Sequence, residues 1–273
     1  MGTSADPTAV GSVEPERLEG ELEVVGRIAA SSNFSVLARV GGDGGVHVIY
    51  KPVRGERPLW DFPEGTLAGR EVAAHVVSEL GGWHVVPTTI LRDGPLGPGA
   101  VQQWIGDPFD PVAPDRVVDI VPVGRVPAGW CGVIDGETPD GSAVTVAHAT
   151  TEDVRSLSVL DAVLNNSDRK GSHCLRDDAG RLWAIDHGVT FHATPKLRTV
   201  LWGWAGEPLA PADLDRLRAV EAGLLRDDVC ALLGELLPAE DVDALAGRVA
   251  RLLRDGRHPL PSRDWPSVPW PAF

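Results

Sequence analysis

Two short stretches decide how this chain is interpreted: Asn165-Asn166-Ser167-Asp168-Arg169-Lys170-Gly171-Ser172-His173 and Ile185-Asp186-His187-Gly188. In the first, an aspartate is followed by a lysine two residues later and by a histidine five residues later. The second presents another aspartate in the order Asp-x-Gly. Phosphoryl transfer needs such groups, because carboxylates and a neutral ligand hold a metal ion on the phosphates, one group orients the attacking hydroxyl and a cation absorbs charge. The spacing therefore predicts a phosphoryl-transfer site.

The same spacing occurs in the protein-kinase pattern, where a loop aspartate precedes a metal-binding asparagine by five positions. Here Asp168 precedes His173 by that interval. Each stretch also has a simpler interpretation, since Asn-Asn-Ser-Asp is typical of turns and Asp-His-Gly can close a hairpin. Leu182-Trp183-Ala184-Ile185 favours the catalytic interpretation, because it reads as a buried strand that delivers Asp186 at its end. Both aspartates are then expected at the mouth of one cleft.

Two upstream residues fit the same pattern. Val46-His47-Val48-Ile49-Tyr50-Lys51 alternates like a strand and ends on Lys51, where a phosphate-contacting lysine is required. Residues 68–80 have helical period, and Glu71 near their start is the candidate partner that holds Lys51 in place. A strand-end lysine or a helical glutamate is usually a surface residue. The order and spacing relative to the two downstream stretches support the functional interpretation.

The segment 26–40 reads as a strand, a polar turn and a second strand. It lacks the Gly-x-Gly-x-x-Gly of protein kinases. The turn residues Ser31, Ser32 and Asn33 are still able to present backbone N–H groups and hydroxyls to phosphates. A plain hairpin explains the segment equally well.

Several motifs together resemble those of the phosphatidylinositol 3- and 4-kinase-like superfamily. The chain looks most like its compact bacterial branch related to type II phosphatidylinositol 4-kinases, and specifically the kinase-like proteins of actinobacteria. The Trp202-Gly203-Trp204 segment also resembles the tryptophan-rich stretch of type II enzymes. The resemblance covers about residues 20 to 205, and the motifs in their order are Ser31-Ser32-Asn33-Phe34, Lys51, Gly69-Arg70-Glu71, 85–89, 99–105, Asn166-Ser167-Asp168-Arg169 and 184–191.

This resemblance implies an α+β fold with two protein-kinase-like lobes, a small β-rich N-lobe and a larger, mainly helical C-lobe. It implies ATP as the phosphoryl donor, with Lys51 on the α-phosphate and Asp186 as a ligand of Mg²⁺ or Mn²⁺. Asp168 is expected to orient or deprotonate the acceptor hydroxyl, and Lys170 to stabilise the transferred phosphoryl group. The hinge that reads the adenine would be Gln102, Gln103, Trp104 and Ile105.

Two departures from the family pattern concern the loop. Lipid kinases often carry histidine two residues after the loop aspartate, whereas Lys170 stands there, as in protein serine/threonine kinases. His173 replaces the metal-binding asparagine, and an imidazole suits Mn²⁺ better than Mg²⁺. This histidine either shifts the metal preference or weakens catalysis. The acceptor that ranks first is a protein Ser/Thr residue, including one of this chain itself; a lipid or small-molecule alcohol ranks second, and a nucleotide-binding regulatory pseudokinase is the alternative of another class.

The net charge of −14 bears on partners. Such a surface repels phosphates and anionic headgroups, so nucleic acid is not expected as a partner and stable membrane association is disfavoured. Arg181, Lys196 and Arg198 are candidates for a local basic patch, although a solvated face is the simpler interpretation. Three isolated cysteines without metal-ligand spacing, and a polar N-terminus, predict a cytoplasmic protein with reduced thiols.

Composition divides the chain into a flexible N-terminal arm at 1–16, an N-lobe at 17–105 and a C-lobe at 106–273. The C-lobe includes a Pro/Gly-rich insert at 106–150 and a Pro/Trp-rich tail at 259–273. The insert is expected to be ordered around the cleft and to help select the substrate. The tail is expected to pack on the domain surface, and a docking role ranks behind that.

Three helices are expected in the C-lobe. Residues 151–164 read as a helix capped by Thr151, with Asp153 in its first turn. Two further helices are expected at about 211–235 and 238–254.

Overall fold

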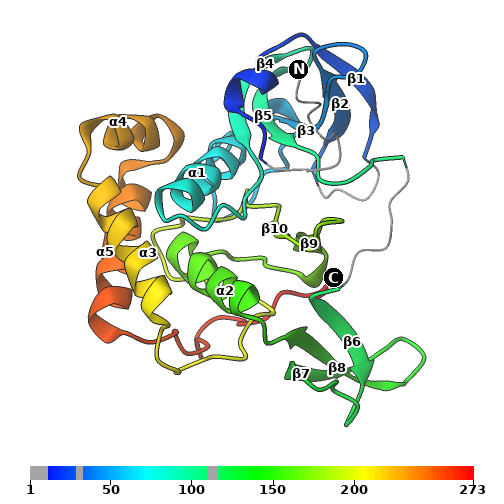
Figure 1. Ribbon diagram of the computed structural model, residues 1–273, viewed down its shortest axis with the longest axis vertical. Helices are drawn as coiled ribbons and strands as arrows, with labels where there is room; N and C mark the ends of the chain where they lie inside the picture. The colour runs from blue at the N-terminus through cyan, green and yellow to red at the C-terminus, as the bar shows by residue number, and fades with distance from the viewer. Residues whose placement is uncertain (1–11, 29–32, 110–115) are drawn as a thin grey trace, which may run out of the picture.

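The N-terminal part of the protein forms a small lobe around a five-stranded antiparallel sheet, with the strand order β1-β2-β3-β5-β4 (Figure 1). The computed structural model describes residues 12–28, 33–109 and 116–273. The elements of the small lobe are η1 (Pro15–Leu18), β1 (Leu22–Arg27), β2 (Val36–Val40), β3 (Val46–Pro52), η2 (Val53–Gly55), α1 (Leu67–Leu80), β4 (Thr89–Gly94) and β5 (Gly97–Gln103).

Alternating apolar residues build the core of this lobe, because successive side chains of a strand point to opposite faces. In β2, for example, Val36, Ala38 and Val40 are buried, and they pack with Leu18. The N-terminal arm expected at 1–16 therefore needs a correction for its described part. The Val13 N–H donates to Gln103 Oε1 at 3.0 Å, so the chain from residue 12 onward belongs to the small lobe.

The large lobe is mainly helical (Figure 1). A two-stranded sheet pairs β9 with β10 beside the cleft, and a three-stranded sheet in the order β6-β8-β7 occupies the insert. The strand β6 contacts η3, so the insert lies beside the predicted catalytic loop. The elements are β6 (Val118–Pro122), β7 (Trp130–Glu137), β8 (Ala143–Ala149), α2 (Glu152–Leu164), η3 (Gly171–His173), β9 (Cys174–Arg176), β10 (Leu182–Ala184), α3 (Pro211–Gly223), α4 (Asp227–Leu236) and α5 (Ala239–Asp255).

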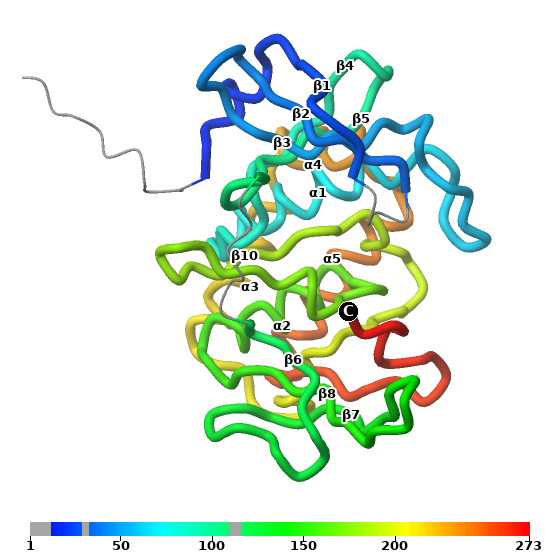
Figure 2. The backbone as a smooth tube through the Cα atoms, turned by 90° about the vertical axis from the view of Figure 1, so that its right-hand side faces the viewer, coloured from blue at the N-terminus to red at the C-terminus, as the bar shows by residue number. Residues whose placement is uncertain are grey.

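The fold class expected from the sequence is confirmed. The fold is α+β and kinase-like, with a helix between β3 and β4 and with the predicted catalytic loop following α2. Figure 2 shows the small lobe seated over the large one, and the C-terminal tail returning to the region of β6. Among the described residues, no helix combines the length and the apolar character needed to cross a membrane.

Two details of the expected helices were wrong. The single helix expected at 211–235 is two helices, because the chain turns after Gly223. A Cβ at that glycine would lie 3.0 Å from the Leu80 side chain, so α3 ends in close contact with α1, and α4 then packs against α1 as well. Thr151 precedes α2 as expected, but its hydroxyl donates to Asp153 Oδ1 at 2.5 Å and caps no backbone amide.

A buried arginine attaches α1 to the large lobe. Arg70 Nη2 lies 2.6 Å from Asp241 Oδ2 on α5, and Nη1 donates to the Thr190 carbonyl at 2.5 Å. The neighbouring Gly69 lies against α4, because a Cβ there would be 2.4 Å from the Leu236 carbonyl oxygen. The helix that carries Glu71 is therefore fixed on the large lobe by charge and by close packing.

We expect Arg70→Met to lower the free energy of unfolding by about 3–5 kcal/mol, because it leaves the Asp241 carboxylate buried without its partner. The matched control is Arg218→Met, at an arginine that is 63% exposed and pairs with an exposed aspartate, where a loss below about 0.5 kcal/mol is expected. Urea unfolding of the three proteins measures both effects. Equal midpoints for the two variants would contradict the anchoring role of Arg70.

Candidate active site

The described residues that the sequence predicts for the site line two adjoining cavities between the lobes. A cavity of about 480 Å³ is lined by Asn33, Lys51, Glu71, Asp168, Lys170, His173 and Asp186. A slot of about 250 Å³ is lined by Gln102, Gln103, Trp104 and Ile105, and it shares Lys51, His173 and Asp186 with the larger cavity. Ser31 and Ser32 lie outside the described residues.

Lys51, on β3, is held between two carboxylates. Its ammonium donates to Glu71 Oε1 and, at 2.9 Å, to Asp186 Oδ1. Burial alone would lower the pKa of Lys51, but attraction to Asp186 and Glu71 outweighs it and raises the pKa above its usual value. The second oxygen of Glu71 accepts the His187 backbone N–H at 3.0 Å, so the glutamate links the lysine to the segment that carries Asp186.

Asp186 follows β10, the strand whose presence the sequence predicts. Its backbone is left-handed, with φ of 62°, a conformation that aspartate adopts more readily than most residues. This turn points the carboxylate toward Lys51 and His173. The Lys51 ammonium, acting against burial, holds the pKa of Asp186 well below its usual range, so the carboxylate is charged at neutral pH.

Asp168 and Lys170 lie together on the loop after α2. The Asn166 side-chain oxygen accepts the Asp168 backbone N–H at 3.0 Å, which shapes the turn, and Lys170 Nζ lies 3.2 Å from Asp168 Oδ2. Burial raises the pKa of Asp168, although the Lys170 ammonium opposes the shift. A partly exposed carboxylate with a raised pKa is a better proton acceptor than an ordinary surface aspartate.

His173 is a neutral, buried imidazole. Its Nε2 lies 3.4 Å from Asp186 Oδ2, and burial lowers the pKa of His173 to about 4 in spite of that carboxylate. Its Nδ1 accepts the Lys170 backbone N–H over a long 3.5 Å contact. To bind an ion through Nε2, the ring would carry its proton on Nδ1 and lose only this weak contact.

The donor set suits an ion that phosphates also hold. The described residues contain no group of three His, Cys, Asp or Glu side chains that would enclose a metal. Asp186 and His173, whose side chains lie 3.4 Å apart on the wall of both cavities, form a pair of candidate ligands. Mg²⁺ in nucleotide sites commonly takes one or two protein ligands and completes its shell with phosphates and water. The two residues therefore fit such an ion.

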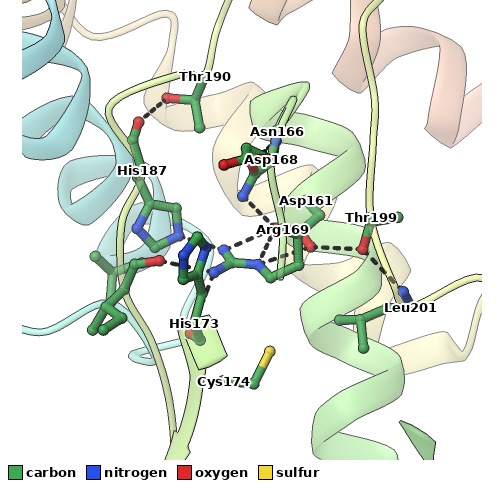
Figure 3. Close-up of polar contacts among 12 residues, drawn as sticks. Asp161, Asn166, Asp168, Arg169, His173, Cys174, His187, Thr190, Thr199 and Leu201 are labelled. Atoms are coloured by element: carbon green, nitrogen blue, oxygen red, sulfur yellow. Dashed lines mark hydrogen bonds and ion pairs between the residues drawn. The ribbon is translucent and has the colours of Figure 1, made fainter. Parts of the chain in front are cut away.

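Arg169 is a structural residue of the site that the sequence did not reveal. Its guanidinium is fully buried and donates to both oxygens of Asp161 on α2, and to the Ile185 carbonyl at 2.9 Å (Figure 3). Its Nη2 also lies 2.7 Å from His187 Nε2. Because arginine only donates, this ring nitrogen accepts, and His187 carries its proton on Nδ1. A charged residue next to Asp168 in the sequence gives no local signal of burial.

Apolar side chains from both lobes line the slot. Ile28 and Ile49 line it from the small lobe, and Leu175 and Ile185 line it from the large lobe. The contacts of the predicted hinge residues differ in part from the expectation. The backbone N–H of Trp104 donates to the His47 carbonyl at 2.9 Å, so it is not free to bond to a base. The Gln102 side chain is likewise turned into the lobe, where its Nε2 donates to Thr89 Oγ1 at 2.8 Å.

The C-terminal tail reaches the predicted catalytic loop, a contact that was not expected from the sequence. The Gly171 N–H donates to the Ala272 carbonyl at 2.8 Å, and a Cβ at this glycine would meet the Phe273 ring at 2.4 Å. Phe273 lines the same 480 Å³ cavity as Asp168. The tail is thus part of the cavity wall, and glycine at position 171 allows its close approach.

The interpretation of Lys196 as part of a solvated basic patch was wrong. Its side chain is 5% exposed and pairs with Asp61, and its ammonium lies 4.8 Å from the centre of the Trp60 ring and 5.1 Å from that of Trp265. Cation–π contact and an ion pair compensate for the burial of this charge. Lys196 therefore joins the small lobe to the tail.

Comparison with known proteins gives one related sequence of nearly the same length. Protein Rv2133c of Mycobacterium tuberculosis (strain ATCC 25618 / H37Rv) is 42% identical over 261 residues, which are 93% of this chain and 93% of that protein. The chain belongs to the family of Rv2133c. No family model matches the sequence. Among solved structures, the crystal structure of the Golgi casein kinase is similar with a TM-score of 0.46 and 11% identity, over 90% of this chain and 79% of that one.

In this member of the Rv2133c family, we expect His173 to make stability pH-dependent. The pKa of His173 is lowered from 6.5 to about 4 in the folded state, so the unfolded chain binds a proton there first as the pH falls. The stabilisation is complete above pH 6.5 and is lost progressively down to about pH 4, by on the order of 2–3 kcal/mol.

Urea unfolding of the native protein and of His173→Asn between pH 7.5 and pH 4 measures this loss as the change in their stability difference. Other buried histidines are common to both proteins and cancel. The exposed His84→Asn variant controls for the substitution itself. Parallel pH profiles for native protein and His173→Asn would contradict the assignment of a buried neutral ring.

Proposed function

We propose that this protein is an ATP-dependent phosphotransferase that moves the γ-phosphate of ATP to a hydroxyl group. The observation that carries the proposal is the arrangement of Lys51, whose ammonium contacts both Glu71 and Asp186 in the cavity that also contains Asp168. The same lysine, glutamate and metal-binding aspartate must be in place together in an active kinase.

The slot and the larger cavity suit the two halves of a nucleotide. An adenine would lie between the apolar side chains that line the slot from the two lobes, and the phosphates would extend past Lys51 toward Asn33. Asp186 and His173 would hold Mg²⁺ or Mn²⁺, which neutralises phosphate charge when it is bound. Lys51 adds a fixed positive charge that phosphates meet in a partly dehydrated site.

Asp168 supplies the chemistry at the acceptor. It accepts a hydrogen bond from the acceptor hydroxyl and takes up its proton as the oxygen bonds to the γ-phosphorus and the bond to the β–γ bridging oxygen breaks. The raised pKa of Asp168, caused by burial, suits this uptake. Lys170 lies beside it and stabilises charge on the transferred group.

The acceptor that we propose first is a protein Ser/Thr residue, including one of this chain itself. Lys170 stands at the position that protein serine/threonine kinases give to lysine, and a net charge of −14 opposes stable contact with anionic membranes. A lipid or small-molecule alcohol is the second acceptor class, which the resemblance to phosphatidylinositol kinases supports.

A nucleotide-binding regulatory pseudokinase is the second candidate function, and His173 at the asparagine position favours it. Incubation of the purified protein with γ-labelled ATP and Mg²⁺ or Mn²⁺ distinguishes the two. Label on protein, on added liposome lipids or on small alcohols supports a kinase and identifies its acceptor class. Nucleotide binding without transferred label supports the pseudokinase.

We expect the two aspartates to separate binding from transfer. Asp186→Asn should abolish metal-dependent ATP binding, whereas Asp168→Asn should leave binding nearly intact and slow transfer by about 10²–10⁴-fold, because one holds the ion and the other receives the proton. Titration calorimetry and label transfer measure the two effects. Asp178→Asn, at an exposed turn residue, is the control. Equal binding losses in the two site variants would show that the roles are wrongly divided.

We expect His173 to set the metal preference. The native protein should favour Mn²⁺ over Mg²⁺, and His173→Asn should shift the ratio toward Mg²⁺, because an amide oxygen is a harder ligand than an imidazole nitrogen. ATP turnover measured with each ion for both proteins gives the two ratios. Identical ratios would leave His173 as a structural histidine beside the loop.

A further inference from the structure

Arg57 is the cation of the larger cavity that the site described so far does not use. Among the described residues, three lysine and arginine side chains line this cavity, namely Lys51, Arg57 and Lys170. Lys51 contacts two carboxylates, and Lys170 contacts Asp168. Arg57 has no carboxylate within ion-pair distance in the part of the chain that the structure describes. The Arg57 guanidinium thus lies on the cavity wall without an ion-pair partner among the described residues. In a chain of net charge −14, it is available to an anionic ligand.

The backbone around Arg57 is fixed on both sides. Its N–H donates to Asn33 Oδ1 at 2.9 Å, and the Phe34 N–H donates to the Gly55 carbonyl at 3.1 Å, which ties the segment to the turn between β1 and β2. On the other side, the carboxylate of Glu56 accepts the first backbone N–H groups of α1, at 3.2 and 2.9 Å. The guanidinium therefore projects from a held backbone rather than from a free loop.

The position of Arg57 in the cavity indicates which part of a nucleotide it would contact. Lys51 lines both the slot and the larger cavity, whereas Arg57, Asp168 and Lys170 line the larger cavity and not the slot. A nucleotide whose base fills the slot passes Lys51 first, and its far end extends into the larger cavity, which Arg57 and Asp168 line. The far end of ATP is the γ-phosphate.

We propose that Arg57 binds the γ-phosphate and makes the site prefer a nucleoside triphosphate to a diphosphate. This inference rests on the proposed function. A guanidinium binds a phosphate through two parallel hydrogen bonds, which a lysine ammonium does not reproduce. After transfer, the phosphoryl group belongs to the acceptor and ADP no longer reaches Arg57. The same residue thus favours loading of ATP and release of ADP.

The test compares two nucleotides on four proteins. Titration calorimetry measures the binding of ADP and of an ATP analogue with a nitrogen bridge between its β- and γ-phosphates, both with Mg²⁺. The proteins are the native chain, Arg57→Ala, Arg57→Lys and Arg54→Ala. Arg54 is the matched control, because it is an exposed arginine three residues away that lines the neighbouring hollow with Arg57 but not the cavity.

We expect the native protein to bind the analogue more tightly than ADP. Arg57→Ala should weaken binding of the analogue about tenfold or more while ADP affinity changes less than about twofold, as for the loss of one charge-assisted contact. The affinity of Arg57→Lys for the analogue should lie between those of the native protein and of Arg57→Ala. Arg54→Ala should bind both nucleotides as the native protein does. Thermal unfolding of each variant checks that this exposed substitution leaves the fold intact.

Three results would overturn the inference, and they are distinguishable. Equal weakening of ADP and analogue by Arg57→Ala would show a general charge effect or a diphosphate contact. A native protein that binds both nucleotides equally would rule out a γ-phosphate contact while leaving the proposed function standing. A native protein that binds neither would refute the proposed function together with the inference.

Discussion

The buried guanidinium of Arg169 is the interaction on which the rest of the site depends. It is fully buried, and removing a charge from water is costly unless the charge is paired and its donors are satisfied. Asp161 pairs with it (Figure 3). The carbonyls of His173 and Ile185 accept from its Nη1, and the ring of His187 accepts from its Nη2. These partners come from α2, from the end of the catalytic loop and from the chain after β10. Burial of the Arg169 guanidinium therefore requires that these three segments meet in one arrangement.

A second chain of contacts joins this large-lobe network to the small lobe. His187 accepts from Arg169 through its ring and donates to Glu71 through its backbone N–H, and Glu71 in turn contacts Lys51. Since Arg70, the neighbour of Glu71, is anchored on α5, the helix cannot move without breaking a buried ion pair. The lysine on β3 is thus positioned by interactions that begin in the large lobe. This continuity explains how residues on four separate elements line one cavity.

The sequence predicted what local pattern encodes. Strand alternation and helical period placed Lys51 at a strand end and Glu71 on a helix. The order of the motifs predicted that both residues belong to one site with Asp186. The pairs that fix the lobes together escaped prediction, because Arg70 and Asp241, or Lys196 and Asp61, are far apart in the chain and each reads alone as a surface charge. The break between α3 and α4 also escaped prediction, although Gly223 ends α3 and Asp227 and Asp228 begin α4; both helices pack against α1. Local pattern carries no information on such tertiary partners.

The charges of the cavity also constrain how a nucleotide would enter. Lys51 is shared between Glu71 and Asp186, so its positive charge is already compensated in the free protein. In the proposed function, a triphosphate alone would add negative charge beside two carboxylates, which is unfavourable in a partly buried site. A nucleotide that arrives with its divalent ion avoids this conflict, because Asp186 can then bind the ion while Lys51 contacts the phosphates. The lysine and the aspartate that neutralise each other in the free site would thus exchange partners together, which couples nucleotide binding to metal binding.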